Sequence, residues 1–465
     1  MATLILAVLS ALVLVGLGLE WLFKRTGIPD VLVLLVLGLL ASVLGIFQVE
    51  DLRGFDKIFT TAALVLILFE GSVRLRLTEL RTAALSSVLI TGVGFLVTAG
   101  AVAALGWALF GMRPLAALCL GAILGGTSSA VVIPMVATLP LAPHVKTTLT
   151  LESALTDVLC IVFAMALVGV LTAGSVDALD VGRSLIAAFL GAVVIGIVAG
   201  VAWAYGLRAL RRDRTSMVVV GAAVFLVFAA TEALGAFGAI AVLAFGVTLG
   251  NATLLARGSV KPEELALASG ESMFLAEIAF LLKVLFFVYL GAALKLDGWQ
   301  PFVFGGLATL AVFAVRPLAV HAAFSSKTTT RADATVAAAL GPKGLAAAVL
   351  AGLPGQAGIK EGASIEAIVF GTVLFSISIA AAIVLFRELP FIVGAYGRVF
   401  GRFPVQALVP PSPAPSAASL GGNASSSEVR EAPAEAKDPD PAEAQLASGE
   451  QQASAGGEEA IPKAP

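Results

Sequence analysis

The sequence predicts an all-α membrane protein that crosses the bilayer about thirteen times. Hydrophobic residues make up 59% of its 465 residues and charged residues only 13%, whereas soluble domains are about 45–50% apolar and about 25% charged. The apolar residues also gather into runs of about 20, the length that a helix needs to cross the hydrocarbon core. Composition and run length together predict a polytopic membrane protein.

Thirteen runs meet this length criterion, counted along the whole chain. The first has no basic segment before it and no typical cleavage site after it, so we expect a spanning helix and not a removable signal peptide. In order, the runs are Thr3–Phe23, Val31–Phe47, Phe55–Val73, Ala83–Phe110, Pro114–Leu139, Thr147–Leu171, Ser184–Leu207, Met217–Leu234, Ala236–Leu255, Ser272–Leu294, Phe302–Phe324, Ala332–Leu353 and Ser364–Phe386.

The loops between these runs alternate in charge. Every second loop is rich in Lys and Arg, with seventeen such residues in total against six in the intervening loops. Basic loops of membrane proteins face the cytoplasm. We therefore expect a multi-pass protein of the cell membrane with its N-terminus outside and its C-terminus inside.

The composition changes near residue 404. Residues 404–465 are rich in Pro, Ala, Ser, Gly and Glu and contain few large apolar side chains. Such a segment cannot bury enough surface to fold alone. The sequence thus predicts a membrane domain over residues 1–403 and a disordered, acidic cytoplasmic tail over residues 404–465.

Two carboxylates lie inside the sixth apolar run, at Glu152 and Asp157. A charged side chain at the centre of a bilayer costs about 2.5–3.5 kcal/mol, so each needs a partner, a cavity or a proton. Five residues apart on a helix, they point about 140° away from each other, while Ser153 shares a face with Asp157. We expect one acid to face a cavity and the other a cation, for which Arg316 and Lys343 are the candidates.

Two runs contain residues that interrupt helices. Gly125 and Gly126 precede three hydroxyl residues in the fifth run, and Gly341-Pro-Lys-Gly344 lies in the twelfth. Unwound backbone at membrane depth is tolerated only where it lines a cavity or is buried in protein. Breaks at corresponding places in two halves are typical of an ion site in an inverted-repeat transporter. Runs one to six and eight to thirteen are the predicted repeats.

At these residues the chain resembles the monovalent cation/proton antiporters of the sodium/proton exchanger type, to which the NhaP proteins belong. Glu152-Ser-Ala-Leu-Thr-Asp157 is similar to the family's Glu-Ser-x-x-Asn-Asp signature, and Leu68-Phe-Glu-Gly71 to its Phe-Glu-Gly motif. The segment ending at Gly344 resembles the Arg-Gly motif of the second broken helix, with Lys343 in place of arginine. The resemblance covers roughly residues 1–400.

This resemblance implies a fold like that of NhaA and NapA, with two broken helices that cross at mid-membrane. It implies that Asp157 carries the cation and the proton, and that Glu152 is a structural acid paired with Arg316. It also implies a homodimer. Na⁺ is expected at Asp157, Ser153 and Thr127; the remaining candidates for the cation site are Ser128, Glu70 and Thr156.

The sequence departs from the family pattern in two places. Thr127-Ser128-Ser129 is closer to the break of Kef-type potassium/proton antiporters, and Thr156 replaces the usual asparagine. A potassium/proton antiporter therefore stays open as an alternative. Because Thr156 carries no charge, a single carboxylate titrates at this place, and we expect electroneutral 1:1 exchange.

Other classes of protein have little support. No channel-type filter sequence is present, and two cysteines and two histidines are too few for a disulfide framework, a metal cluster or a His-based triad. We expect a transporter and not an enzyme, with no cofactor and no nucleic-acid partner.

Overall fold

The computed structural model describes residues 2–26, 29–45, 56–75, 77–173, 178–210, 216–256, 262–265, 267–294, 299–387 and 389–405. These residues form helices joined by turns and short loops, and no strand occurs among them. The predicted all-α fold is confirmed. Residues 406–465, which contain nearly all of the predicted tail, lie outside the described part of the chain.

The helices follow the predicted apolar runs. Their bounds are α1 Ala2–Thr26, α2 Asp30–Val43, α3 Asp56–Val73, α4 Leu77–Ala108, α5 Pro114–Leu124, α6 Ser129–Thr138, α7 Pro143–Ala173, α8 Ala178–Leu210, α9 Ser216–Ala233, α10 Gly238–Gly250, α11 Pro262–Leu265, α12 Ser269–Ala292, α13 Gln300–Ala323, α14 Arg331–Ala339, α15 Leu345–Ala351, α16 Leu353–Gln356, α17 Gly362–Leu385 and α18 Pro390–Val399.

Seven segments of the described chain are long and apolar enough to cross a membrane, and six shorter apolar helices accompany them. One of the seven, Pro114–Thr138, contains both α5 and α6. The protein is therefore polytopic, while thirteen crossings stay a prediction. Aliphatic side chains such as Leu85 and Leu190 are exposed on the surface of the protein. Their exposure is expected for a membrane protein, because these side chains face lipid and not water.

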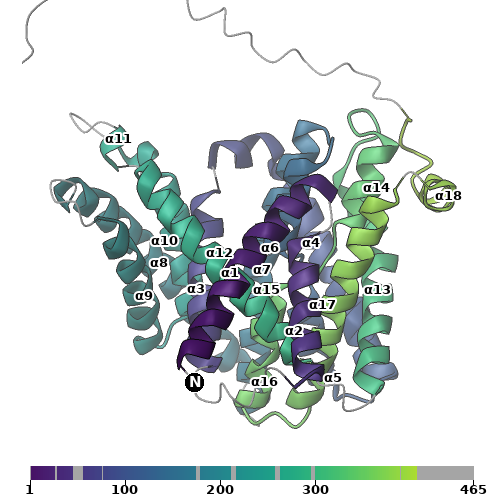
Figure 1. Ribbon diagram of the computed structural model, residues 1–465, viewed down its shortest axis with the longest axis horizontal. Coiled ribbons are helices and arrows are strands. Elements are labelled where there is room, and N and C mark those ends of the chain that lie inside the picture. The colour runs from purple at the N-terminus through teal and green to yellow at the C-terminus, as the bar shows by residue number, and fades with distance from the viewer. Residues whose placement is uncertain are drawn as a thin grey trace, which may run out of the picture. The chain divides into compact units, whose positions relative to one another are not determined.

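The helices pack into two bundles (Figure 1). We call α1, α2, α3, α8, α9, α10 and α12 the scaffold bundle, because each packs mainly on other members of this set. The core bundle contains α4 to α7 and α13 to α17. The seam between the bundles is formed by fewer pairs, among them α3 with α15, α2 with α17 and α7 with α8.

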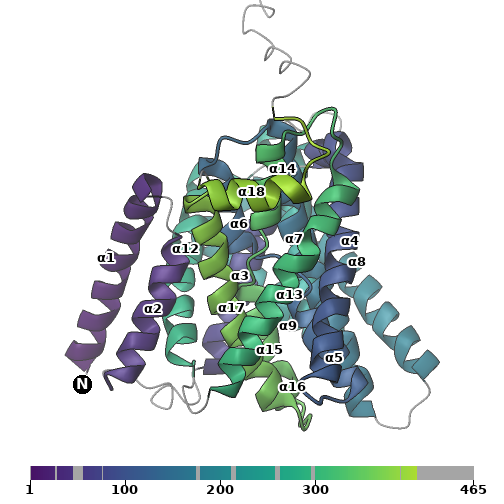
Figure 2. The same ribbon diagram turned by 90° about the vertical axis from the view of Figure 1, so that its right-hand side faces the viewer.

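Both predicted helix breaks lie in the core bundle. The first separates α5, which ends at Leu124, from α6, which begins at Ser129; the second separates α14, which ends at Ala339, from α15, which begins at Leu345. The two broken helices run in opposite directions (Figure 2), as inverted repeats require. The described part of the chain thus contains the two opposed broken helices that the sequence predicts.

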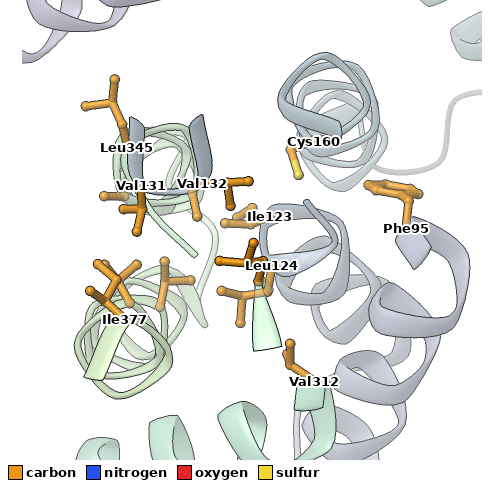
Figure 3. Close-up of a cluster of buried hydrophobic side chains, with 14 of the residues drawn as sticks. Phe95, Ile123, Leu124, Val131, Val132, Cys160, Val312, Leu345 and Ile377 are labelled. Atoms are coloured by element: carbon orange, nitrogen blue, oxygen red, sulfur yellow. The ribbon is translucent and has the colours of Figure 1, made fainter. Parts of the chain in front are cut away.

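Apolar side chains surround the breaks (Figure 3). Ile123, Val131, Leu345 and Ile377 come from α5, α6, α15 and α17 and gather in one buried cluster. A side chain at Gly125 would meet the ring of Phe95, since a Cβ there would lie 2.6 Å from two ring carbons. The cluster keeps water away from the unwound backbone and so strengthens the polar contacts made there.

An ion pair between a buried carboxylate and a partly buried ammonium group joins two helices of the scaffold bundle. Lys283 Nζ in α12 lies 2.7 Å from Asp30 Oδ2 at the start of α2. The two helices approach closely enough that a Cβ at Gly38 or Gly291 would overlap the backbone of the neighbouring helix. The tight contact and the ion pair together fix the position of α2 on α12.

A second ion pair joins two helices of the core bundle outside their apolar segments. Arg113, just before α5, donates hydrogen bonds of 2.7 Å from Nε and Nη2 to both carboxylate oxygens of Glu361, just before α17. The hydrogen bonds from Arg113 lower the pKa of Glu361 to about 2. Because Glu361 is ionised at any pH above this value, the contact persists across the physiological range and does not act as a pH switch.

Replacing Lys283 by Met is expected to destabilise the protein, because it leaves the Asp30 carboxylate buried without its cation. Losing one partner of a buried pair costs about 3 kcal/mol or more, which a lowered Tm in detergent would report. Adding Asp30→Asn to Lys283→Met removes the stranded charge and should recover most of the loss. A single Lys283→Met variant with the wild-type Tm would contradict the role given to this pair.

Candidate ion-binding site

The two unwound segments are in direct contact at the centre of the core bundle. Ser128, between α5 and α6, donates its backbone N–H to the carbonyl of Pro342, between α14 and α15, at 2.8 Å. A Cβ at Gly344 would overlap the Ser128 side chain, so only glycine allows this approach. The breaks therefore form a single crossing made of residues that lie more than 200 positions apart.

Lys343 neutralises the end of the first half-helix. Lys343 is 1% exposed, and its ammonium group donates to the carbonyl of Gly126, two residues after the end of α5, at 2.7 Å. Its backbone N–H donates to Ser376 Oγ in α17 at 2.9 Å. The last carbonyls of a helix have no intrahelical partner and carry the negative end of the helix dipole, so a cation here is stabilising.

Arg316 does the same for the other half-helix. Its guanidinium donates to the carbonyls of Ala337 and Leu340, at the end of α14, over 3.3 and 3.1 Å. It also forms two hydrogen bonds with the Glu152 carboxylate, one of which measures 2.7 Å. Arg316 and not Lys343 is thus the partner of Glu152. Both side chains are nearly inaccessible, at 3% and 2% exposure.

Asp157 contacts the first break at the start of α6, whereas Lys343 contacts it just after α5. Ser129, the first residue of α6, donates its hydroxyl to Asp157 Oδ2 at 2.7 Å, so the carboxylate lies at the positive N-terminal end of a half-helix. Asp157 is 9% exposed, more than Glu152. No basic side chain among the described residues forms an ion pair with it. This is the arrangement of an acid that is available to a mobile ion.

The other hydroxyl residues predicted as ligands are Thr127 and Ser128 in the first break, Thr156, which contacts it from α7, and Ser153, one turn before Asp157 on α7. Thr156 Oγ1 accepts the backbone N–H of Thr127 at 3.0 Å. Ser153 donates to the Thr150 carbonyl of its own helix at 3.0 Å, which leaves its oxygen lone pairs able to accept a cation. Ser128 Oγ is buried with no hydrogen-bond partner among the described residues. Of the predicted ligands, Ser128 and Ser153 therefore keep the most free acceptor capacity.

Glu70 is not brought into this group. It forms an ion pair with Arg74, which directly follows the last residue of α3, and its side chain is 20% exposed. No hydrogen bond or ion pair in the described chain links Glu70 to the crossing. Because α3 packs on α15 at the seam of the bundles, Glu70 lies on the scaffold side of that seam.

Three residues at the crossing were not predicted from the sequence. Ser129 contacts Asp157, Cys160 Sγ accepts the backbone N–H of Gly126 at 3.0 Å, and Ser376 contacts Lys343. Ser129 had a signal, since a hydroxyl at the first position after a helix break is well placed to face a carboxylate. The other two had none, because their partners are set by how α7 and α17 pack on the breaks.

Residues 8–387 match the family described as "Sodium/hydrogen exchanger, transmembrane". The chain belongs to this family. Its members are transporters that exchange a monovalent cation for a proton, and the predicted resemblance is confirmed.

Two proteins similar to this chain are named for different cations. A K⁺/H⁺ antiporter, NhaP2 from Shewanella sp. strain MR-4, is 27% identical over 77% of this chain and 62% of its own length. A probable Na⁺/H⁺ antiporter 2 from Methanocaldococcus jannaschii is 23% identical over 75% of this chain and 84% of its own length. The chain thus spans about three fifths of the first relative.

The fold also matches that of a solved exchanger. The structure of the sodium proton antiporter MjNhaP1 from Methanocaldococcus jannaschii, at pH 8, is similar with a TM-score of 0.67 and 22% sequence identity. The match covers 83% of this chain and 99% of the other. At this identity the likeness concerns the fold alone.

Replacing Arg316 by Ala is expected to impair folding as well as transport. The variant leaves Glu152 buried without a cation and two α14 carbonyls without donors, at a cost of about 3–5 kcal/mol for the stranded charge alone. Size-exclusion chromatography of detergent extracts would show a smaller monodisperse fraction and a lower Tm. Glu152→Gln combined with Arg316→Met should fold better than Arg316→Ala; a stable, fully active Arg316→Ala protein would remove the assignment.

Proposed function

We propose that this family member exchanges Na⁺ or Li⁺ for H⁺, with both ions competing for Asp157. The observation that carries the proposal is the position of this carboxylate. Asp157 contacts Ser129 at the start of α6 and takes no part in the buried Glu152–Arg316 pair. Glu152 of α7 therefore has a structural role, and Asp157 of the same helix can bind a cation or a proton.

The cation site that we propose is built from oxygen atoms at the first break. Asp157 supplies the charge, Ser128 and Ser153 supply hydroxyl oxygens, and Thr127 supplies its carbonyl or hydroxyl oxygen. Unwound backbone and half-helix ends are the usual sites of coupling ions in such folds. Thr156, whose hydroxyl accepts the N–H of Thr127, positions the break, and Glu70 serves the approach to the site from the scaffold side.

Competition at one carboxylate couples the two ion movements. A proton or a cation neutralises Asp157, and either loaded form leaves the core bundle with the same net charge. The empty form has one additional negative charge, which disfavours a shift of the core bundle through the membrane. The core bundle then moves against the scaffold bundle only when loaded, with one cation exchanged for one proton.

The alternative is K⁺/H⁺ exchange at the same carboxylate. It is favoured by the three hydroxyls of Thr127-Ser128-Ser129 and by the name of the 27% identical Shewanella relative. The residues that hold the proton are common to both proposals. The size of the oxygen cage decides between them, and therefore cation preference is the property to measure.

We further propose the cellular setting that the sequence implies. The alternation of basic loops favours an N-terminus outside the cell membrane and a C-terminal tail in the cytoplasm. The protein would act as a homodimer in control of intracellular pH and sodium.

Asp157→Asn is expected to abolish cation-dependent proton movement while leaving the fold intact, because Asn has the same shape but does not titrate. Acidified everted vesicles report this as dequenching of a pH-sensitive dye after NaCl, LiCl or KCl is added. Glu277→Gln, an exposed carboxylate of α12, is the matched control and should keep wild-type activity. Activity in a folded Asp157→Asn protein would refute the carrier role, and a response to K⁺ alone would select the alternative.

Exchange is expected to be electroneutral. In proteoliposomes with an imposed membrane potential of about 100 mV, an exchange that moved one net charge would experience about 2.3 kcal/mol of driving force. The initial rate of Na⁺-driven proton release should therefore be the same at either sign of the potential. A rate that changes severalfold with the sign of the potential would contradict 1:1 stoichiometry.

A further inference from the structure

A cavity of about 350 Å³ lies where the ends of α1, α6 and α17 meet. Its walls include Arg25 and Thr26 from α1, Thr138 from α6, and Arg387 from the turn after α17. The volume is within the range of small-ligand sites. Two arginines from distant parts of the chain thus line one cavity.

The surroundings of this cavity resemble the boundary between membrane and water. The helix α18 begins three residues after Arg387 and runs across the ends of the spanning helices (Figure 2), as interfacial helices do. Trp21, a residue type enriched at this level of the bilayer, is 56% exposed, and the Arg25 guanidinium lies 4.2 Å from its ring centroid. Leu385 and Phe386, beside Arg387, are 47% and 49% exposed.

We infer that this cavity binds a phosphate group carried by an anionic phospholipid. Basic pockets between spanning helices recognise anionic headgroups, and guanidinium groups match phosphate through paired hydrogen bonds. The exposed side chains of Trp21, Leu385 and Phe386 provide apolar surface for the acyl chains next to the headgroup. A free phosphate ion shares the charge but does not use this apolar surface.

The cavity also lies on the seam between the two bundles. Arg25 belongs to α1 of the scaffold bundle, whereas Thr138 belongs to α6 of the core bundle and Arg387 follows α17 of the same bundle. At its other end, α6 begins with Ser129, which contacts Asp157. A lipid phosphate that contacts both arginines ties the bundles together, stabilises this arrangement, and slows any step in which the bundles shift.

Binding is tested with purified full-length protein in detergent. Short-chain phosphatidylglycerol should raise the Tm relative to phosphatidylcholine, and Arg25→Gln or Arg387→Gln should weaken the apparent affinity about tenfold or more. Arg398→Gln, which removes the same charge from exposed α18, is the matched control and should respond as the wild type does. Equal loss in all three variants would indicate diffuse surface charge and overturn the inference.

A parallel measurement with inorganic phosphate distinguishes a lipid phosphate from a free phosphate ion. Stabilisation by phosphatidylglycerol but not by millimolar phosphate supports the lipid. An equal effect of inorganic phosphate, lost in Arg25→Gln, overturns the lipid and leaves an ion site. No effect of either probe overturns the site altogether.

The effect on exchange rests on the proposed function, whereas the binding test does not. In proteoliposomes the wild type should exchange more slowly as phosphatidylglycerol replaces phosphatidylcholine, and Arg387→Gln should be severalfold less sensitive to this change. If binding is present and all variants lack exchange, the proposed function fails and the lipid site stands. If exchange is present and insensitive in every variant, the coupling between lipid and bundle movement fails.

Discussion

Two helices that end inside a membrane leave backbone carbonyls without partners, and the core bundle is organised around the cations that satisfy them. Lys343 contacts the end of α5, and Arg316 contacts the end of α14. Each cation is supplied by an element other than the half-helix whose carbonyl it contacts, so the crossing forms only when α5, α13, α14 and α15 pack together. The buried charges thus specify the arrangement at a substantial desolvation cost.

The need to pair buried charges also gives the two acids of α7 different roles. Arg316 needs a counter-charge because it is buried, and Glu152 supplies it. Asp157, five residues further along, is on a different side of the helix and receives a neutral hydroxyl from Ser129. Helix geometry therefore separates a structural acid from an available one, and the available one lies at the first break, where unwound backbone and hydroxyl groups offer additional oxygen atoms.

Much of this arrangement follows from local sequence, and the remainder depends on packing. The apolar runs predict the helices, and the glycines near 125 and 341 predict the breaks, because both are properties of short segments. The partner of Glu152 lies 164 residues away, so the choice between Arg316 and Lys343 required the packing of α13 on α14 or the family resemblance. The Asp30–Lys283 pair, 253 residues apart, and the contact of Ser376 with Lys343 had no signal in the sequence for the same reason.

The central claim is that cation and proton compete for Asp157, and proton release on cation binding tests it most directly. Purified protein in weakly buffered detergent solution is titrated with NaCl, LiCl or KCl, and the released protons are measured together with the cation bound. The account predicts up to one proton released per cation bound, a ratio that falls at high pH as Asp157 loses its proton beforehand, and no release from Asp157→Asn. Cation binding without proton release at any pH, or equal release from Asp157→Asn, would contradict it.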